Sequence, residues 1–287
     1  MTTLGSVWPL FDLRLTTPRL ELRPIRDEDI PAAVDAARSG IHEPGKSPFS
    51  TPWTEVPGEE LGTNMARWYW RCRAECSPES WTLLLGIWHE GKFIGCQDVG
   101  AKEFALLKTV STGSWLKQSV QGRGLGKEMR AAVVLWAFDW LGAEVAESEA
   151  AAWNEASLGV SRSLGYELNG TTRKAWGPQI ETVQHVRLTP NTFKRPDWQL
   201  QVEGHEAAAK FLKVTDHEAG YGPSRRSASP TRAMRRSPSD RSGAPGGSGV
   251  PRVPRRACEP WEGTSALSDG EGPWPAERNH GPPATSA

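Results

Sequence analysis

The residues from Gly113 to Lys127 combine a strand, a glycine-dense loop and a helix start. The run from Thr109 to Leu116 has the composition of a strand, and the loop Gln-Gly-Arg-Gly-Leu-Gly-Lys follows it. Apolar residues at helical spacing predict the helix, and they are Met129, Val133, Trp136 and Trp140. Unpaired backbone N–H groups and the positive end of the helix dipole would then face one ligand. The chemistry predicted here is the binding of a phosphate or pyrophosphate.

The spacing of the glycines excludes two common phosphate-binding loops. A P-loop has Ser or Thr after its Gly-Lys pair, but Glu128 follows Lys127 here, and Gln121 stands in place of the first glycine. The dinucleotide fingerprint fails because Lys127 occupies its third glycine position. The pattern that fits is Q-x-x-G-x-G, formed by Gln121, Gly124 and Gly126. A side chain at these glycines would hold a diphosphate away from the backbone amides. The alternative is a tight strand-to-helix connection without a ligand.

A second segment, from Asn154 to Tyr166, reads Asn-Glu-Ala-Ser-Leu-Gly-Val-Ser-Arg-Ser-Leu-Gly-Tyr. Asn154 can cap a helix, and Gly165 stands where a left-handed residue would end it. Together, this segment and the loop resemble the GNAT acetyltransferases, whose coenzyme A pyrophosphate loop has the Q-x-x-G-x-G pattern. The opening from Leu15 to Ile30 is similar to that of the subgroup that acetylates protein N-termini, ribosomal-protein-serine/alanine acetyltransferases among them.

This resemblance implies that acetyl-CoA is the cosubstrate and that no metal takes part. The implied coenzyme-binding residues are Trp115, Leu116, Gln121, Gly122, Arg123, Gly124, Leu125, Gly126, Lys127 and Asn154. The thioester is expected in the gap between the strand that ends near Trp115 and the strand near Ala150. In the family a backbone N–H, here around Trp115 and Leu116, stabilises the oxyanion, and losing such a donor costs about 3 to 4 kcal/mol.

The residues that move protons depart from the commoner family pattern. Many members carry Tyr seven residues after the Asn, where this chain has Ser161. Ser157 is therefore the predicted proton donor to the departing thiolate; its alternative is an ordinary polar residue in a first helical turn. Glu149 is the predicted base, acting through a water, and strand alternation aims Glu147 to the same face. The alternative for both is an acidic, solvent-facing strand.

The predicted acceptor is a primary amine, and an α-amine fits best. An α-amine of pKa about 8 is roughly one-tenth neutral at pH 7, whereas lysine, with a pKa of about 10.4, is neutral less than about once in a thousand. A site without an obvious strong base suits the α-amine. Two acceptors stay open: a protein N-terminus, and a small amine metabolite or antibiotic. A third possibility is that the protein binds the coenzyme without turnover. Trp53 and Trp70 are candidates for the wall of the acceptor slot, while helical spacing favours the core for Trp68.

The composition of the whole chain bounds its partners. Its 287 residues carry 34 basic and 34 acidic side chains, so there is no overall attraction to nucleic acid or an anionic membrane. We recognise neither a membrane span nor a secretory signal in the sequence. The four cysteines lack the spacing of a zinc site, so we expect reduced thiols and a cytoplasmic protein. Monomer and homodimer are both left open.

The composition changes after residue 213. Residues 214–287 contain 11 Pro, 10 Gly and 10 Ser in 74 positions, and they offer too little apolar surface to offset chain entropy. We therefore predict an N-acetyltransferase domain at 1–213 and a disordered tail at 214–287. Between Gly222 and Arg256 nine Arg oppose the single acid Asp240. This stretch is either a basic arm attracted to RNA or a solvated linker without a partner. We favour the linker.

The order of the elements predicts an α/β fold with a mixed, mostly antiparallel central sheet flanked by helices. Strands are expected at 19–23, 81–88, 93–99, 109–116, 144–150, 166–168 and 181–188. Helices are expected at 27–40, 60–76 and 154–165 and from the glycine loop to 141. The helix after the loop returns the chain to a parallel neighbouring strand, and so positions the glycine loop at the edge where two strands end.

Overall fold

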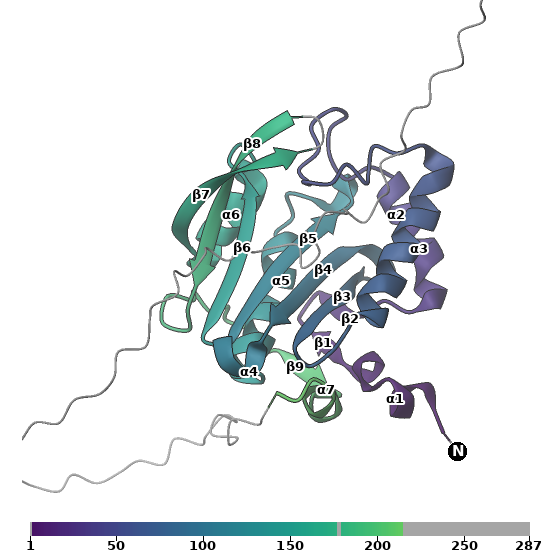
Figure 1. The fold of residues 1–287 in the computed structure, drawn as a ribbon, viewed down its shortest axis with the longest axis vertical. Helices are drawn as coiled ribbons and strands as arrows, with labels where there is room; N and C mark the ends of the chain where they lie inside the picture. The colour runs from purple at the N-terminus through teal and green to yellow at the C-terminus, as the bar shows by residue number, and fades with distance from the viewer. Residues whose placement is uncertain (1, 177–178, 215–287) are drawn as a thin grey trace, which may run out of the picture. The chain divides into compact units, whose positions relative to one another are not determined.

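The structure is a computed structural model that describes residues 2–176 and 179–214. Within these residues one sheet has the strand order β7-β8-β6-β5-β4-β3-β2-β1-β9 (Figure 1). The strands are β1 (Arg14–Thr16), β2 (Leu20–Pro24), β3 (Ser80–His89), β4 (Lys92–Lys102), β5 (Thr109–Leu116), β6 (Val145–Ala151), β7 (Glu167–Trp176), β8 (Gln179–Leu188) and β9 (Gln201–Glu203). Only β5 and β6 pair in parallel; the other neighbours are antiparallel. The prediction of a mixed, mostly antiparallel sheet is confirmed.

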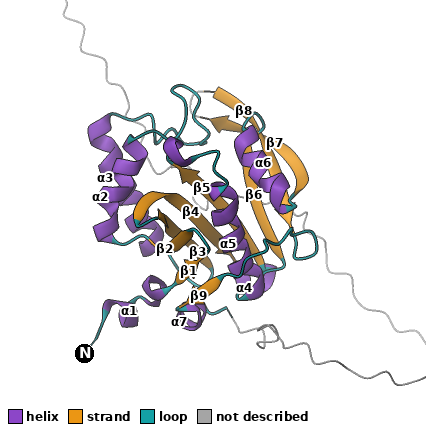
Figure 2. Cartoon of the chain, turned by 180° about the vertical axis from the view of Figure 1, so that it is seen from behind, coloured by secondary structure: helices purple, strands orange, loops and turns teal. Residues whose placement is uncertain are grey.

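Helices cover both faces of this sheet. They are α1 (Leu4–Val7), α2 (Ile30–Arg38), α3 (Gly58–Ala74), α4 (Phe104–Leu107), α5 (Leu125–Asp139), α6 (Glu155–Leu164) and α7 (His205–Phe211), with 3-10 turns η1 (Pro9–Asp12), η2 (Asp27–Asp29) and η3 (Gln118–Val120). Figure 2 shows α5 and α6 on one face, and Figure 1 shows α2 and α3 beside β2 to β4. The two faces of β4 belong to two cores: Ile94 and Val99 pack in the core that includes α5, whereas Phe93 and Cys96 pack with α2 and α3. A register shift, from Ile87↔Gly95 to Trp88↔Phe93, leaves Ile94 as an extra residue, which is why Ile94 and Cys96 lie on different faces. We call the second side the acceptor face.

Helix α5 is the central support of the glycine loop. Nearly all of its residues are buried, and the side chain of Trp136 is 0% exposed. The predicted spacing of Met129, Val133 and Trp136 describes one packed face, but the alanines between them are buried as well. A helix held on all sides keeps the loop at its N-terminus in a fixed place.

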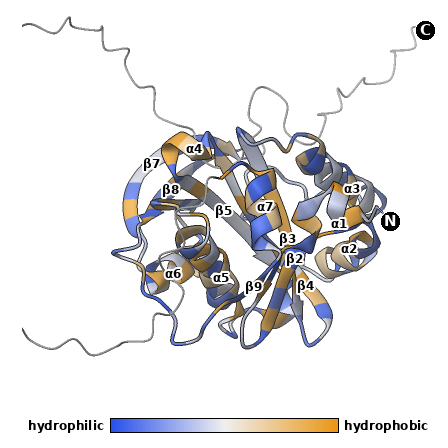
Figure 3. Ribbon diagram, turned by 90° about the horizontal axis from the view of Figure 1, so that it is seen from below, coloured by the Kyte–Doolittle hydropathy of each residue, from blue (hydrophilic) through white to orange (hydrophobic). Residues whose placement is uncertain are grey.

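The prediction of a strand at 166–168 was too short. Strand β7 continues to Trp176 and pairs with β8. The pattern gave no signal because β7 is an edge strand whose residues are mostly exposed, with hydrophilic and hydrophobic positions intermixed (Figure 3). The short strands β1 and β9 and the helices α1, α4 and α7 were also not predicted, since three to seven residues carry little periodicity.

The predicted tail, including the arginine-rich stretch from Gly222, lies outside the described residues, so its disorder and the domain boundary after 213 stay predictions. In the part of the chain that the structure does describe, none of the helices is both long and apolar enough to span a bilayer.

Candidate active site

The predicted coenzyme loop lies between β5 and α5 and exposes its backbone. Gly122 and Gly124 have φ angles of +72° and +77°, a conformation that favours glycine, and Gly124 is the N-cap of α5. No side chain caps this helix end, so its first backbone N–H groups are free to meet a ligand. Gln121 holds the loop in place because its Nε2 donates to the carbonyls of Ile41 (2.8 Å) and Leu116 (2.7 Å).

The side chains of the loop differ in what they can offer. Arg123 and Lys127 are exposed cations, the chemistry that binds phosphate groups. Leu125 is 1% exposed and belongs to the core, so only its backbone can face a ligand. A Cβ on Gly122 would meet open space, and a Cβ on Gly126 would meet only ordinary contacts, the nearest at 3.7 Å. These residues fit a pyrophosphate: free amides, nearby cations and an unobstructed approach.

A buried carboxylate, Glu128, fastens the first turn of α5 to the β1–β2 turn. It accepts from the Thr17 hydroxyl at 2.6 Å, from the Arg19 amide at 3.0 Å and from Arg19 Nε at 2.6 Å. Arg19 also donates to the carbonyl of Arg123 at 3.1 Å, which reaches into the loop. In the sequence, Glu128 stands out only as the residue that breaks the P-loop pattern. Its usable signal was an acid in the first turn of a helix that is mostly apolar.

Strands β5 and β6 separate after a short paired stretch. Their parallel register runs from Thr109↔Val145 to Ser111↔Glu147 and then ends. Beyond this point the Ser148 hydroxyl still donates to the Thr112 carbonyl at 2.9 Å. From there Figure 1 shows the backbones of β5 and β6 diverging toward their C-terminal ends, and the glycine loop follows the end of β5. The structure thus contains the gap expected between the strand near Trp115 and the strand near Ala150, and we call it the β5–β6 gap.

Helix α6 begins as the sequence predicts, with Asn154 as its N-cap. The Asn154 side chain accepts from the Ser157 amide at 3.1 Å, and Gly165 ends the helix at φ +93°. The Ser157 hydroxyl is half-buried and makes no hydrogen bond to the residues that the structure describes. Ser161, one turn later, is 2% exposed and donates to the Ser157 carbonyl at 3.2 Å. Of these two serines, Ser157 is the one with an available hydroxyl.

Asp98 on β4 is a candidate that sequence analysis missed. It shares the acceptor face with Cys96, and its Oδ1 accepts from the Gly113 amide at 2.6 Å. A Cβ at Gly113 would lie 2.6 Å from Oδ2, so the carboxylate rests on bare backbone. Burial raises the pKa of Asp98 to about 6, while the Gly113 bond and the charge of Arg130 act in the opposite direction. The available signal was a polar Gln97-Asp98 pair inside an apolar strand.

The two predicted carboxylates of β6 lie on the acceptor face, because they alternate with Ser148, which bonds to α5. Both oxygens of Glu149 accept from Lys174 Nζ, at 3.0 and 2.9 Å, and His185 Nδ1 is 3.3 Å away. Glu149 therefore already has a cationic partner in Lys174. Burial raises the pKa of Glu147, and Arg187 counteracts the rise.

A row of aromatic rings crosses the acceptor face. The ring centroids follow one another at 5.1 Å from Phe49 to Trp53, 6.0 Å to Trp115, 6.1 Å to Phe93 and 5.2 Å to Trp88. The side chain of Trp115 thus faces the acceptor side, while its backbone belongs to the edge of the β5–β6 gap. We call these five rings the aromatic row.

Of the tryptophans proposed for the acceptor slot, Trp53 is in the aromatic row and Trp70 is not. Trp70 is 50% exposed, and its Nε1 donates to Asp27 Oδ1 at 3.0 Å. Trp68 packs against the second core, in the place that its helical spacing favours.

The connection between α2 and α3, residues 40–57, contacts three parts of the molecule around the β5–β6 gap. Its Gly40 carbonyl accepts from the Gln118 amide at 2.9 Å, close to the coenzyme loop. Further along, Lys46 Nζ lies 5.0 Å from the Trp153 ring centroid, and Trp176 Nε1 donates to the Ser47 carbonyl at 3.1 Å. Figure 1 shows this connection reaching the tips of β7 and β8. It joins the loop, the start of α6 and the β7–β8 hairpin at one place.

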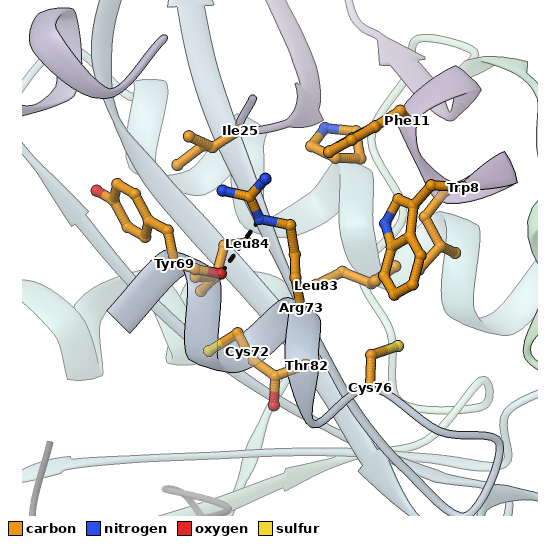
Figure 4. Close-up of a pocket in the computed structure, with 12 residues that line it drawn as sticks. Trp8, Phe11, Ile25, Tyr69, Cys72, Arg73, Cys76, Thr82, Leu83 and Leu84 are labelled. Atoms are coloured by element: carbon orange, nitrogen blue, oxygen red, sulfur yellow. Dashed lines mark hydrogen bonds between the residues drawn. The ribbon is translucent and has the colours of Figure 1, made fainter. Parts of the chain in front are cut away.

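A small cavity of about 30 Å³ lies apart from these residues, between η1, α3 and β3 (Figure 4). None of the predicted site residues lines it. Its two thiols are held protonated, because burial raises the pKa of Cys76 to about 11 and raises that of Cys72 further. Across the described residues no group of His, Cys, Asp and Glu is arranged to hold a metal ion.

The fold and the gap beside a glycine loop define an acetyltransferase. Residues 19–167, more than half of the chain, match the acetyltransferase (GNAT) domain family, and the chain belongs to that family. It is an acetyl-CoA-dependent N-acetyltransferase that acts on an amine acceptor. The expected family and cosubstrate are confirmed, whereas the roles of the individual site residues stay proposals.

Two solved structures illustrate the likeness. Mycobacterium smegmatis RimJ in complex with CoA-disulfide aligns with a TM-score of 0.53 at 18% identity, covering 71% of this chain and 97% of that chain. A Salmonella typhimurium acetyltransferase that modifies the N-terminal serine of ribosomal protein L7/L12 aligns with a TM-score of 0.49 at 16% identity, covering 60% and 96%. The likeness to RimJ supports the fold.

Proposed function

We propose that this enzyme acetylates the α-amine of a protein N-terminus in the cytoplasm, by direct attack of the amine on the thioester. The observation that carries the proposal is Asp98, a carboxyl with a pKa of about 6 on the acceptor face, one strand from the β5–β6 gap. Such a group accepts protons at neutral pH. It is well matched to an α-amine of pKa about 8, whereas deprotonating a lysine side chain costs about 3 kcal/mol more free energy.

The coenzyme side of the reaction is assigned to the residues around the gap. Acetyl-CoA supplies the activated acetyl group as a thioester. The amides of Gly122 to Lys127, with the Arg123 and Lys127 side chains, would hold its pyrophosphate. Backbone N–H groups around Trp115 and Leu116 would stabilise the oxyanion. Asn154 fixes the first turn of α6, which contains Ser157.

The proton movements use residues on both sides of the gap. Asp98 takes a proton from the α-ammonium, directly or through water, so the neutral amine can form the new C–N bond. The C–S bond then breaks while the acylated nitrogen gives up its second proton, and the Ser157 hydroxyl hydrogen-bonds the departing thiolate and relays that proton to it. Asp98 thereby replaces Glu149 as our first candidate for the base, because Lys174 already neutralises Glu149. Glu149 stays the second candidate.

The acceptor is proposed to lie along the aromatic row, which includes Trp53 and Trp115. Flat rings offer a large apolar contact area at little entropic cost, which suits the first side chains of a peptide. The free thiols Cys72, Cys76 and Cys96 are compatible with the reducing cytoplasm.

The test uses three acceptors with the same core sequence. They are a peptide with a free N-terminus and no lysine, its N-terminally blocked form, and a blocked peptide with one internal lysine. We expect coenzyme A release and a gain of one acetyl group only with the free N-terminus. Turnover of the lysine peptide at an equal rate would refute the α-amine assignment. Turnover of small amines but no peptide would favour a small amine or antibiotic as acceptor, and release with no amine at all would favour a binding module.

A further inference from the structure

Arg130 is a buried cation that the proposed mechanism does not use. Its side chain rises from α5, and the residue is 3% exposed. Its Nη1 donates to the Ser148 hydroxyl of β6 at 3.1 Å, and its Nη2 donates to the Ser114 hydroxyl of β5 at 3.3 Å. These partners lie on two strands that have already separated. The guanidinium therefore lies across the β5–β6 gap.

The guanidinium forms no ion pair with any residue that the structure describes. Within the described residues its hydrogen-bond partners are hydroxyl groups, and its Nε has none. The carboxylate that feels its charge, Asp98, is bonded to Gly113 on the opposite face of β5. A permanently charged group that is buried without an anion is costly, and that cost falls when an anionic ligand joins it. The guanidinium could therefore donate hydrogen bonds to the carboxylate of a ligand.

The position of Arg130 indicates which part of a ligand it would meet. The glycine loop stands at the open end of the β5–β6 gap, and the Arg130 bridge lies toward the end where β5 and β6 pair. A coenzyme A thioester whose pyrophosphate is on the loop places its pantetheine arm in the gap and its acyl group at the inner end. The acyl group is thus the part of the donor nearest to Arg130.

We propose that Arg130 selects the acyl donor and that this enzyme accepts, besides acetyl-CoA, coenzyme A thioesters of dicarboxylic acids, whose distal carboxylate pairs with the guanidinium. The inference rests on the placement of the thioester under the proposed function. The transfer itself is unchanged: the amine forms the C–N bond, the C–S bond breaks, the thiolate leaves with a proton, and the distal carboxylate stays intact in the product. The acceptor gains a negative charge where acetylation would leave it neutral.

The test compares succinyl-CoA with butyryl-CoA, which have acyl chains of equal length, one ending in a carboxylate and the other in a methyl group. Isothermal titration of the full chain without acceptor measures both dissociation constants. We expect succinyl-CoA to bind at least about tenfold more tightly, a difference of about 1.4 kcal/mol. Equal affinities, or tighter binding of butyryl-CoA, would overturn the inference without use of any variant.

Variants then assign the preference to Arg130. Arg130→Met should remove the preference and leave butyryl-CoA affinity within about threefold, whereas Arg130→Lys should keep part of it. The control is Arg162→Met, an arginine on α6 whose side chain is 58% exposed. A preference that survives in a folded Arg130→Met would contradict the assignment, because a purely structural tie would affect both donors equally.

The proposed function fails separately from this inference. If neither thioester nor acetyl-CoA binds, the β5–β6 gap is not the donor site and the proposed function itself falls. If acetyl-CoA and butyryl-CoA bind and succinyl-CoA has no advantage, only the role of Arg130 is refuted.

Discussion

The backbone N–H of Gly113 donates a 2.6 Å hydrogen bond to Oδ1 of Asp98, so a side chain of β4 rests on the bare backbone of β5. The next residue of β5, Ser114, binds Arg130 on the opposite face. A carboxylate and a guanidinium therefore flank one short stretch of β5, at the level where β5 and β6 have separated. The two charged groups therefore lie on opposite faces of the sheet, close to the β5–β6 gap.

Asp98→Asn should reduce kcat/KM for an N-terminal peptide about a hundredfold or more, since it removes the proposed general base. In the wild type, kcat/KM should fall as the pH drops through about 6, because protonated Asp98 cannot accept a proton. The variant should lose this acidic limb. Steady-state rates between pH 5 and 8.5 measure both effects.

Glu149→Gln is the companion variant for this pH profile. We expect it to keep the acidic limb, because Glu149 is paired with Lys174 and His185. If Glu149→Gln loses the limb and Asp98→Asn keeps it, then Glu149 is the base and Asp98 has a structural role.

The raised pKa of Asp98 also predicts how stability changes with pH. Folding raises this pKa from 3.8 to about 6, so the folded state binds the proton more tightly. The contribution to stability is complete below pH 3.8 and is lost as the pH rises through about 6. Asp98→Asn should therefore reduce the loss of melting temperature between pH 5 and pH 7.5. A variant with the same pH dependence as the wild type would show that Asp98 titrates normally.

Gly124→Val should raise the dissociation constant for acetyl-CoA about tenfold or more. The new side chain is strained at φ +77° and stands where the pyrophosphate needs the backbone. Gly91→Val is the control, because Gly91 has φ +73° in the β3–β4 turn with open space around it. Both variants should lose similar stability in thermal unfolding. An unchanged affinity in Gly124→Val would remove the loop from the coenzyme site.

Arg19→Ala should destabilise the protein more than Glu128→Gln. The first variant leaves a buried carboxylate without its cation, whereas the second leaves an arginine whose side chain is 45% exposed and can reach water. We expect losses of about 2 and about 1 kcal/mol. For Arg19→Ala this corresponds to a melting temperature lower by about 4 to 8 °C. The reverse order would show that the Glu128 interactions contribute little.

Trp53→Ala should raise the KM for the acceptor peptide about tenfold and leave the dissociation constant of acetyl-CoA unchanged, since it shortens the aromatic row. Trp70→Ala is the matched control, because Trp70 is half exposed and bonded to Asp27 outside the row. Equal effects of the two variants on KM would refute the placement of the acceptor.

The parts of the site that follow from local sequence were predictable. The glycine loop, the start of α5 and the Asn154 cap could be recognised because glycines at positive φ angles and capping residues at helix ends form short local sequence patterns. The gap could be placed from the element order, because a helix that returns the chain to a parallel strand makes β5 and β6 neighbours.

The parts that depend on register were not predictable. Asp98 is a candidate because Gly113 lies opposite it on β5, and Arg130 is a candidate because β5 and β6 are no longer paired where it binds them. Neither relationship can be read from one segment of the sequence. The same holds for Glu149, whose neighbours Lys174 and His185 come from two other strands. Burial and pairing across strands decide the charges of the site, while sequence reports only which charges exist.

The most direct test of the account is a crystal structure of the full chain with coenzyme A. We predict pyrophosphate density against the amides of residues 122–127, and the pantetheine arm between β5 and β6, with its sulfur near Ser114 and Ser148. Density for the coenzyme outside this gap, for example in the cavity beside Cys72 and Cys76, would contradict the assignment of the active site.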